Sequence, residues 1–124
     1  MKTMLIADDE EVITFALEAY FTQLGYEVQI AATREEALAR IGRTAYDILV
    51  ADLRLSGTGG TEGLDVIRAA RHRSPRTVIL LLTAYLLPDA VEAAKAAGAD
   101  LAVQKPRPLP FLAQAITLLL AGRS

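Results

Sequence analysis

The feature that most constrains this fold is the alternation of short apolar runs with longer segments of helical periodicity. The apolar runs are Met4–Ala7, Val28–Ala31, Ile48–Ala51, Val78–Leu82 and Leu101–Val103. The first, third and fourth runs are apolar at consecutive positions, which is typical of strands that are covered on both faces in a parallel sheet. The sequence therefore predicts an α/β protein.

The segments that follow the runs predict five helices. Their periodic stripes are Val12, Phe15, Ala16, Ala19 and Tyr20; Ala37, Leu38 and Ile41; Leu64, Ile67, Ala70 and Arg71; Ala90, Val91, Ala94 and Ala97; and Leu109, Leu112, Ala113, Ile116, Leu119 and Leu120. Thr33, with Glu36 three residues on, predicts a capping box at the start of the second helix. We interpret 56–63 as a loop. This order predicts a parallel sheet with right-handed crossovers and helices on both faces, in one domain over residues 1–124.

Composition narrows the class of protein. The chain has 124 residues, 52% of them hydrophobic, and a net charge of −2. This charge gives no electrostatic reason to expect binding to nucleic acid or to an anionic membrane. There is no cysteine for a disulfide or thiolate site, and no apolar stretch approaches the roughly 18 residues of a membrane span. We expect a soluble, cytoplasmic protein.

Chemically active side chains follow the predicted strands. Asp8 and Asp9 follow the first strand, Asp52 ends the third, Thr83 ends the fourth and Lys105 ends the fifth. Ligands of open α/β sheets bind outside the carboxyl ends of the strands, so we expect these groups to share one pocket.

Such a cluster suits phosphoryl transfer. Neighbouring carboxylates repel one another, and a hard divalent cation such as Mg²⁺ relieves that repulsion. A lysine ammonium and a threonine hydroxyl can then stabilise a phosphoryl group during its transfer to a carboxylate oxygen.

Five motifs carry a family resemblance. They are Leu5-Ile6-Ala7-Asp8-Asp9-Glu10, Asp47-Ile48-Leu49-Val50-Ala51-Asp52-Leu53, Leu82-Thr83-Ala84, Ala96-Ala97-Gly98-Ala99-Asp100 and Lys105-Pro106. By these motifs the chain resembles, over essentially its whole length, the receiver domain of two-component response regulators. The resemblance implies a flavodoxin-like, three-layer α/β/α fold with strand order 2-1-3-4-5.

The resemblance also implies roles for individual residues. Asp52 resembles the phosphoacceptor. Asp9 resembles a direct Mg²⁺ ligand and Asp8 a ligand that acts partly through water, while the backbone carbonyl of Arg54 stands where the metal shell is usually completed. The resemblance also implies that Asp52 is itself a metal ligand.

Further positions match the switch of the family. Thr83 resembles the hydroxyl that moves toward the phosphoryl group, and Lys105 resembles the lysine that pairs with it. Pro106 resembles the residue that follows this lysine, often through a cis peptide bond. Ala102 departs from the pattern, because an aromatic switch residue usually stands there, and Tyr85 is the nearest substitute.

The loop after Asp52 also departs from the pattern, being about three residues longer than usual and lacking its proline. Arg54 and Tyr85 occupy positions that often tune dephosphorylation in the family. A bulky cation and a ring at these positions lead us to expect slow hydrolysis of the phosphoryl group.

We therefore expect a signalling switch that a histidine kinase or a phosphotransfer protein phosphorylates on Asp52. Such a domain assists its own phosphorylation and dephosphorylation but is not an enzyme. One alternative is a degenerate receiver that acts as a phosphorylation-independent interaction module. Another alternative is an aspartyl-phosphate hydrolase of a different α/β family. Such an enzyme would have a second aspartate two residues after Asp52, and the presence of Arg54 at that position argues against it.

The last helix is apolar nearly all round. Phe111, Ala115 and Leu118 lie off its main stripe, and such helices are normally covered on more than one side. We expect part of this surface to contact a partner, such as a second copy of the chain, together with the fourth helix and the fifth strand.

Overall fold

The computed structural model describes residues 1–55, 60–84 and 86–123 of the chain. Its elements are β1 (Thr3–Ala7), α1 (Glu11–Gln23), β2 (Glu27–Ala31), α2 (Arg34–Arg43), β3 (Ile48–Ala51), α3 (Glu62–Arg73), β4 (Val78–Thr83), α4 (Pro88–Ala97), β5 (Leu101–Gln104) and α5 (Leu109–Ala121). The strands pair in parallel in the order β2-β1-β3-β4-β5. The predicted fold class and strand order are confirmed.

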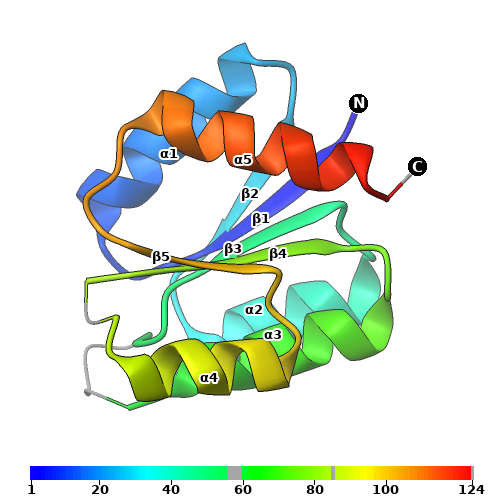
Figure 1. The fold of residues 1–124 in the computed structure, drawn as a ribbon. Coiled ribbons are helices and arrows are strands. Elements are labelled where there is room, and N and C mark those ends of the chain that lie inside the picture. The colour runs from blue at the N-terminus through cyan, green and yellow to red at the C-terminus, as the bar shows by residue number, and fades with distance from the viewer. Residues whose placement is uncertain (56–59, 85, 124) are drawn as a thin grey trace.

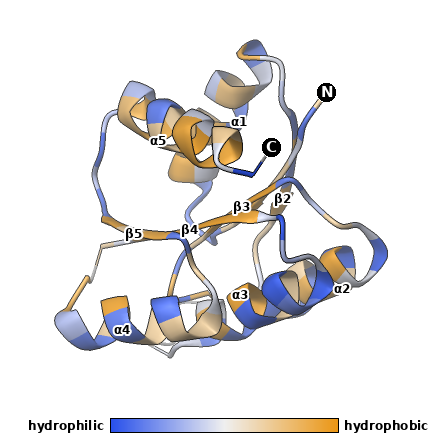
Figure 2. Ribbon diagram, turned by 45° about the vertical axis from the view of Figure 1, so that its right-hand side comes forward, coloured by the Kyte–Doolittle hydropathy of each residue, from blue (hydrophilic) through white to orange (hydrophobic). Residues whose placement is uncertain are grey.

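Helices cover both faces of the sheet. Helices α1 and α5 lie on one face, and α2, α3 and α4 lie on the other (Figure 1). Hydrophobic colour runs along β3, β4 and β5, whereas the helices carry both hydrophobic and hydrophilic residues (Figure 2). No helix in the described part of the chain has the length and apolar character that a membrane crossing needs.

Two hydrophobic cores explain the uninterrupted apolar strands. In β1, Met4 and Ile6 pack in the core beneath α1 and α5, while Leu5 and Ala7 pack in the core beneath α2, α3 and α4. Successive side chains of a strand point to opposite faces, so a strand that is covered on both faces needs an apolar residue at each position.

The apolar stripe predicted for the first helix is wrong. Val12 and Phe15 are 83% and 73% exposed, whereas Leu17 and Phe21 are buried against the sheet. Ile13 and Tyr20 pack partly against the same core. Helix α1 carries apolar residues on two neighbouring sides, so helical periodicity alone does not identify the side that is buried.

The predicted N-cap of α2 is confirmed, and the Glu36 side chain reaches back to the residue before the cap rather than to Thr33 itself. The Thr33 side chain accepts the N–H of Glu36 at 3.1 Å, and Glu36 Oε1 accepts the N–H of Ala32 at 2.7 Å. The predicted loop 56–63 is too long at its end, since α3 already begins at Glu62; residues 56–59 lie outside the described residues.

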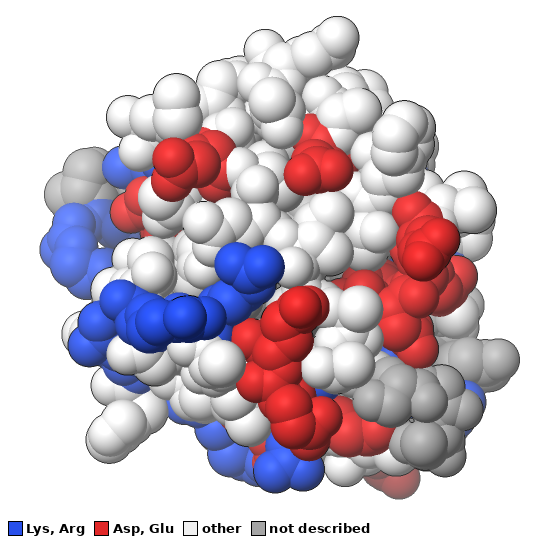
Figure 3. Space-filling view, turned by 180° about the vertical axis from the view of Figure 1, so that it is seen from behind, with Lys and Arg blue, Asp and Glu red and all other residues white. Residues whose placement is uncertain are grey.

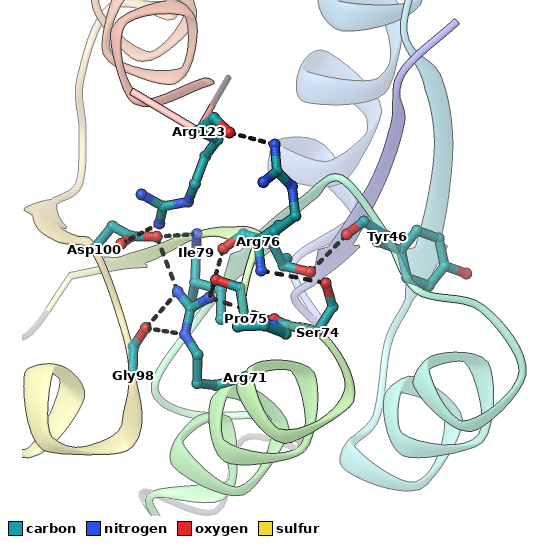
Figure 4. A network of polar contacts seen from close by, with 10 residues as sticks. Tyr46, Arg71, Ser74, Pro75, Arg76, Ile79, Gly98, Asp100 and Arg123 are labelled. Carbon is teal, nitrogen blue, oxygen red and sulfur yellow. Dashed lines mark hydrogen bonds and ion pairs between the residues drawn. The ribbon is translucent and has the colours of Figure 1, made fainter. Parts of the chain in front are cut away.

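A polar network closes the amino edge of the sheet, at the end opposite the predicted site (Figure 4). The guanidinium of Arg71 donates to the carbonyl of Gly98 at 2.8 and 3.1 Å and pairs with Asp100 at 3.1 Å. Asp100 also accepts the N–H of Ile79 at 2.8 Å and pairs with Arg123. This network ties the end of α3 to the starts of β4 and β5 and to the end of α5.

Candidate functional site

The carboxyl edge of the sheet brings one ammonium group into contact with three carboxylates. Lys105 Nζ lies 2.8 Å from Asp8 Oδ2, 3.1 Å from Asp52 Oδ2 and 3.0 Å from Glu10 Oε1. The side chains of Lys105, Asp8 and Asp52 are at most 8% exposed, whereas that of Glu10 is 54% exposed. The predicted convergence of Asp8, Asp52 and Lys105 is therefore observed.

Strand register places these side chains at one height. Ala7 of β1 pairs with Ala51 of β3, so Asp8 and Asp52 are the first residues beyond two neighbouring strands. The N–H of Asp52 donates to the Ala7 carbonyl at 2.9 Å. Because strands β1 and β3 pair in parallel, the two carboxylates leave the same edge of the sheet.

The other predicted site residues flank this cluster. Thr83 ends β4 and is fully buried, and its carbonyl accepts the N–H of Lys105 at 2.8 Å. The Lys105–Pro106 peptide bond is cis, as the resemblance implied. Ala102 is partly buried and packs against the core on the α2, α3 and α4 side. Tyr85 lies outside the described residues.

Burial and neighbouring charges have opposite effects on the pKa values of Asp8 and Lys105. Burial raises the pKa of the Asp8 carboxyl, although hydrogen bonds from Lys105 and from the Glu10 N–H act to lower it. Burial alone would lower the pKa of the Lys105 ammonium, but its contacts with Asp8, Glu10 and Asp52 outweigh that effect and raise the pKa. Lys105 is therefore held charged, and the Asp8 carboxylate is costly to keep ionised.

The carboxylates form a donor set that suits a hard cation. Oxygens of Asp8, Glu10 and Asp52 lie within 4.8 Å of one another. Oxygen donors of this kind fit Mg²⁺ or Ca²⁺, and a cation there would stabilise the ionised Asp8 carboxylate, whose pKa burial raises.

The third carboxylate of this set was not expected. Sequence reasoning named Asp9, but Glu10 completes the group, while Asp9 is partly buried and is not among its members. The spacing contained a signal, because Glu10 follows Asp8 by two residues at the end of the same strand, and its N–H donates to Asp8 Oδ1 at 3.0 Å. Metal ligation by Asp9 stays a prediction.

Arg54 lies beside the acceptor carboxylate. Its backbone N–H faces Asp52 Oδ1 at 3.5 Å, at the outer limit of a hydrogen bond. The Arg54 backbone carbonyl as a metal ligand stays a prediction, as does its effect on hydrolysis.

Comparison with known proteins identifies the family. Residues 4–117 match the family model of the response regulator receiver domain. The chain is 33% identical over 110 residues to a response regulator receiver protein of Anaeromyxobacter sp. (strain Fw109-5), a match that covers 89% of this chain and 45% of that protein. The chain thus spans less than half the length of that relative.

Solved structures agree with this match. A CheY-like receiver domain protein of Methanospirillum hungatei JF-1 has a TM-score of 0.92 and 28% identity, covering 99% of this chain and 96% of that one. A response regulator of Burkholderia pseudomallei, solved with a phosphorylated aspartic acid, a calcium ion and citrate, has a TM-score of 0.85 and 28% identity. That match covers all of this chain and 74% of the other.

Proposed function

The chain belongs to the response regulator receiver domain family, and from this premise we propose that Asp52 is its phosphoacceptor and that residues 1–124 act as one receiver unit. The observation that carries the proposal is the contact of Lys105 Nζ with both Asp52 and Asp8, all three side chains being at most 8% exposed. The Burkholderia structure, which contains a phosphorylated aspartic acid, supports an aspartate as the acceptor in this fold.

The geometry supports a transfer in which a carboxylate oxygen of Asp52 attacks the phosphorus of a phosphodonor. A new O–P bond forms as the bond from phosphorus to the leaving group breaks, and the leaving group departs with the electron pair of that bond. Lys105 already contacts Asp52 and is placed to pair with a phosphoryl oxygen. Mg²⁺, when bound by Asp8, Asp52 and a third donor such as Asp9 or Glu10, supplies charge neutralisation for the transferred group.

The switch that follows uses Thr83 and Lys105. Thr83 ends β4 beside the strand that Lys105 follows, and this position supports a role in which its hydroxyl donates to a phosphoryl oxygen. Ala102 has no ring to rotate into the space that Thr83 leaves. We expect the output to be a conformational population shift rather than turnover of a substrate.

The proposed phosphodonor is a histidine kinase or a phosphotransfer protein. Support comes from the surface beside the pocket, where α1 exposes Val12 and Phe15. These apolar side chains offer a contact surface for a protein that brings its phosphohistidine to Asp52. A small donor such as acetyl phosphate would not need this surface.

Other partner proposals rest on the remaining surface. Phe111 and Leu118 of α5 are 43% and 67% exposed, which supports contact with a second copy of the chain through α4, β5 and α5. In Figure 3, Lys and Arg side chains lie mainly on the left and at the bottom of the face, whereas Asp and Glu side chains lie across its upper part, centre and right. The net charge of −2 supports the expectation that the domain does not bind nucleic acid. Sedimentation at high concentration, with and without beryllofluoride, tests self-association; a monomer under both conditions contradicts it.

Incubation with acetyl phosphate and Mg²⁺ tests the central proposal. Intact-mass measurement and peptide mapping should find one phosphoryl group, on Asp52, which is absent from the Asp52→Asn variant. An inert wild-type protein would support the degenerate interaction module. Sustained release of phosphate over many turnovers would support the hydrolase.

A further inference from the structure

The first turn of α3 packs directly against the backbone of the acceptor. Gly63 is the second residue of α3 and is buried, and its N–H donates to the Leu53 carbonyl at 2.9 Å. A Cβ at this position would lie 1.9 Å from the carbonyl oxygen of Asp52 and 2.9 Å from the Cα of Leu53. These atoms belong to the backbone, so no side-chain rotation relieves the overlap.

The overlap that a Cβ would make with backbone atoms sets Gly63 apart from Gly42 and Gly60. A Cβ at Gly42, in α2, would have no neighbouring atom within 4 Å, and a Cβ at Gly60 would meet the flexible carboxylate of Glu62. Gly63 has no left-handed backbone that would by itself exclude alanine. Close approach to Asp52 is therefore what calls for glycine at this position.

We propose that Gly63 is a positioning residue, which by its lack of a side chain sets the place of the Asp52 carboxylate and of the Arg54 backbone beside it. This inference rests on the proposed function, because it concerns the reactivity of Asp52. It adds a residue outside the carboxylate cluster to the determinants of phosphoryl transfer.

We expect the acceptor segment to share the displacement with the first turn of α3. Asp52 follows the last residue of β3 and is held by its N–H to the Ala7 carbonyl at 2.9 Å and by the contact of its carboxylate with Lys105 at 3.1 Å, so a shift of its peptide would disturb both contacts. Helix α3 is anchored along its length by the buried residues Leu64, Val66, Ile67 and Ala70, and at its end by the Arg71 contacts shown in Figure 4. A side chain at position 63 would therefore displace the peptide that carries the acceptor.

The size of the displacement makes its effect measurable. Real Cβ atoms essentially never approach another atom within 3.0 Å, so a methyl group at Gly63 demands a shift of about 1 Å, and misplacement on that scale costs about 10²-fold in rate. The Arg54 N–H, which faces Asp52 Oδ1 at 3.5 Å, would move with the same peptide.

The test compares Gly63→Ala with two controls. Gly42→Ala makes the same change in an open helix position, and Ile116→Ala opens a cavity in the buried part of α5, away from α3. The rate of Asp52 modification is measured at saturating acetyl phosphate and Mg²⁺, together with Mg²⁺ affinity by calorimetry and unfolding by urea. Rates are compared under conditions in which all variants are folded.

We expect Gly63→Ala to lower the saturated rate by about 10²-fold and to weaken Mg²⁺ binding, with both controls close to the wild type. A Gly63→Ala rate equal to that of the wild type overturns the inference while the proposed function stands. An equal loss in Ile116→Ala also overturns it, because the effect then reflects general destabilisation. A wild-type protein that is not modified at Asp52 overturns the proposed function, and the inference with it.

A measurement on the wild type covers the case in which Gly63→Ala does not fold. Hydrogen exchange of the Gly63 amide, which donates to the Leu53 carbonyl, should slow on addition of Mg²⁺ and beryllofluoride by more than exchange of the Gly42 amide. Equal changes at the two amides would show that the acceptor and Gly63 are not coupled.

Discussion

Lys105 Nζ lies 3.1 Å from Oδ2 of Asp52, although 53 residues separate the two along the chain. The same ammonium contacts Asp8 and Glu10, so one cation holds three acidic side chains together at the edge of the sheet. In this arrangement the lysine offsets the repulsion among the carboxylates and at the same time stands beside the oxygen that would accept a phosphoryl group.

Replacing Lys105 with methionine should destabilise the metal-free protein. Asp8 and Asp52 would be left buried without a compensating charge, which costs on the order of 3 kcal/mol. Urea unfolding in buffer with a chelator measures the loss, and added Mg²⁺ should restore more stability in Lys105→Met than in the wild type. Lys95→Met, on an exposed turn of α4, is the control and should change neither value. No rescue by Mg²⁺ would argue against a cation site among these carboxylates.

Asp8 should make stability depend on pH. Burial raises the pKa of the Asp8 carboxyl above its usual 3.8, so the folded protein holds this proton more tightly than the unfolded chain does. The stability that this provides is present at low pH and is lost as pH rises through the raised pKa. Asp8→Asn should therefore unfold at higher urea than the wild type at pH 7 without metal.

The difference between Asp8→Asn and the wild type should shrink as pH falls through the raised pKa of Asp8. Asp65→Asn, at a partly exposed ion pair on α3, should show no such convergence. A gap that widens toward acid pH would contradict the assigned direction of the shift. Mg²⁺ affinity should fall in Asp8→Asn, so that stability and cation binding change in opposite directions.

Arg54→Ala should shorten the lifetime of the phosphoryl group. The Arg54 backbone lies beside Asp52 Oδ1, and we expect a long cationic side chain at this position to hinder the approach of water. Loss of phosphate from protein modified with acetyl phosphate, followed by intact mass, should be several-fold faster than in the wild type. Arg43→Ala, at the exposed end of α2, is the control. Slower loss in Arg54→Ala would show that the side chain assists hydrolysis.

Much of the fold could be predicted from the sequence because its strongest signals are local. Consecutive apolar residues in β1, β3 and β4 arise from burial on both faces, and Thr33 with Glu36 marks a helix start through contacts within one turn. The positions of Asp52 and Lys105 then follow from the parallel register, since both come directly after strands. Such features need no knowledge of distant contacts.

The sequence predictions fail where contacts between residues far apart in the chain determine the structure. Both Val12 and Leu17 suit an amphipathic helix, and the packing of α1 against the sheet, which buries Leu17, determines the outcome. Glu10 joins the carboxylate group because Lys105, far along the chain, reaches it. Gly63 lay within a predicted loop, and its approach to Asp52 is a tertiary contact that no local pattern encodes.

Two phenylalanines of α1 should differ sharply in their effect on stability. Phe21 is fully buried and makes edge-to-face contacts with Tyr20 and Tyr26, at centroid distances of 5.3 and 5.7 Å. Phe21→Ala should cost about 3–5 kcal/mol, whereas Phe15→Ala, at a side chain that is 73% exposed, should stay within about 0.5 kcal/mol. Urea unfolding of both variants decides which side of α1 is buried. Equal losses of unfolding free energy in the two variants would indicate that the side of α1 that carries Phe15 is also buried.

Arg71 should be intolerant even of lysine. Its guanidinium donates to the carbonyls of Gly98, Pro75 and Thr77 and pairs with Asp100, and an ammonium on a single stem cannot span acceptors on both sides (Figure 4). Arg71→Lys should therefore lower the free energy of unfolding by on the order of 2 kcal/mol, because several partly buried acceptors lose their donor at once.

Arg68→Lys provides the control for that loss within the same helix. Arg68 is 58% exposed and pairs across one turn with Asp65, so its replacement should change stability by less than about 0.5 kcal/mol. Because the Arg71 network lies at the amino edge of the sheet, Arg71→Lys should leave the rate of Asp52 modification unchanged under conditions in which the variant is folded. If folded Arg71→Lys is modified at Asp52 more slowly than the wild type, then the contacts that hold the end of α3 also affect the position of Asp52, through Gly63.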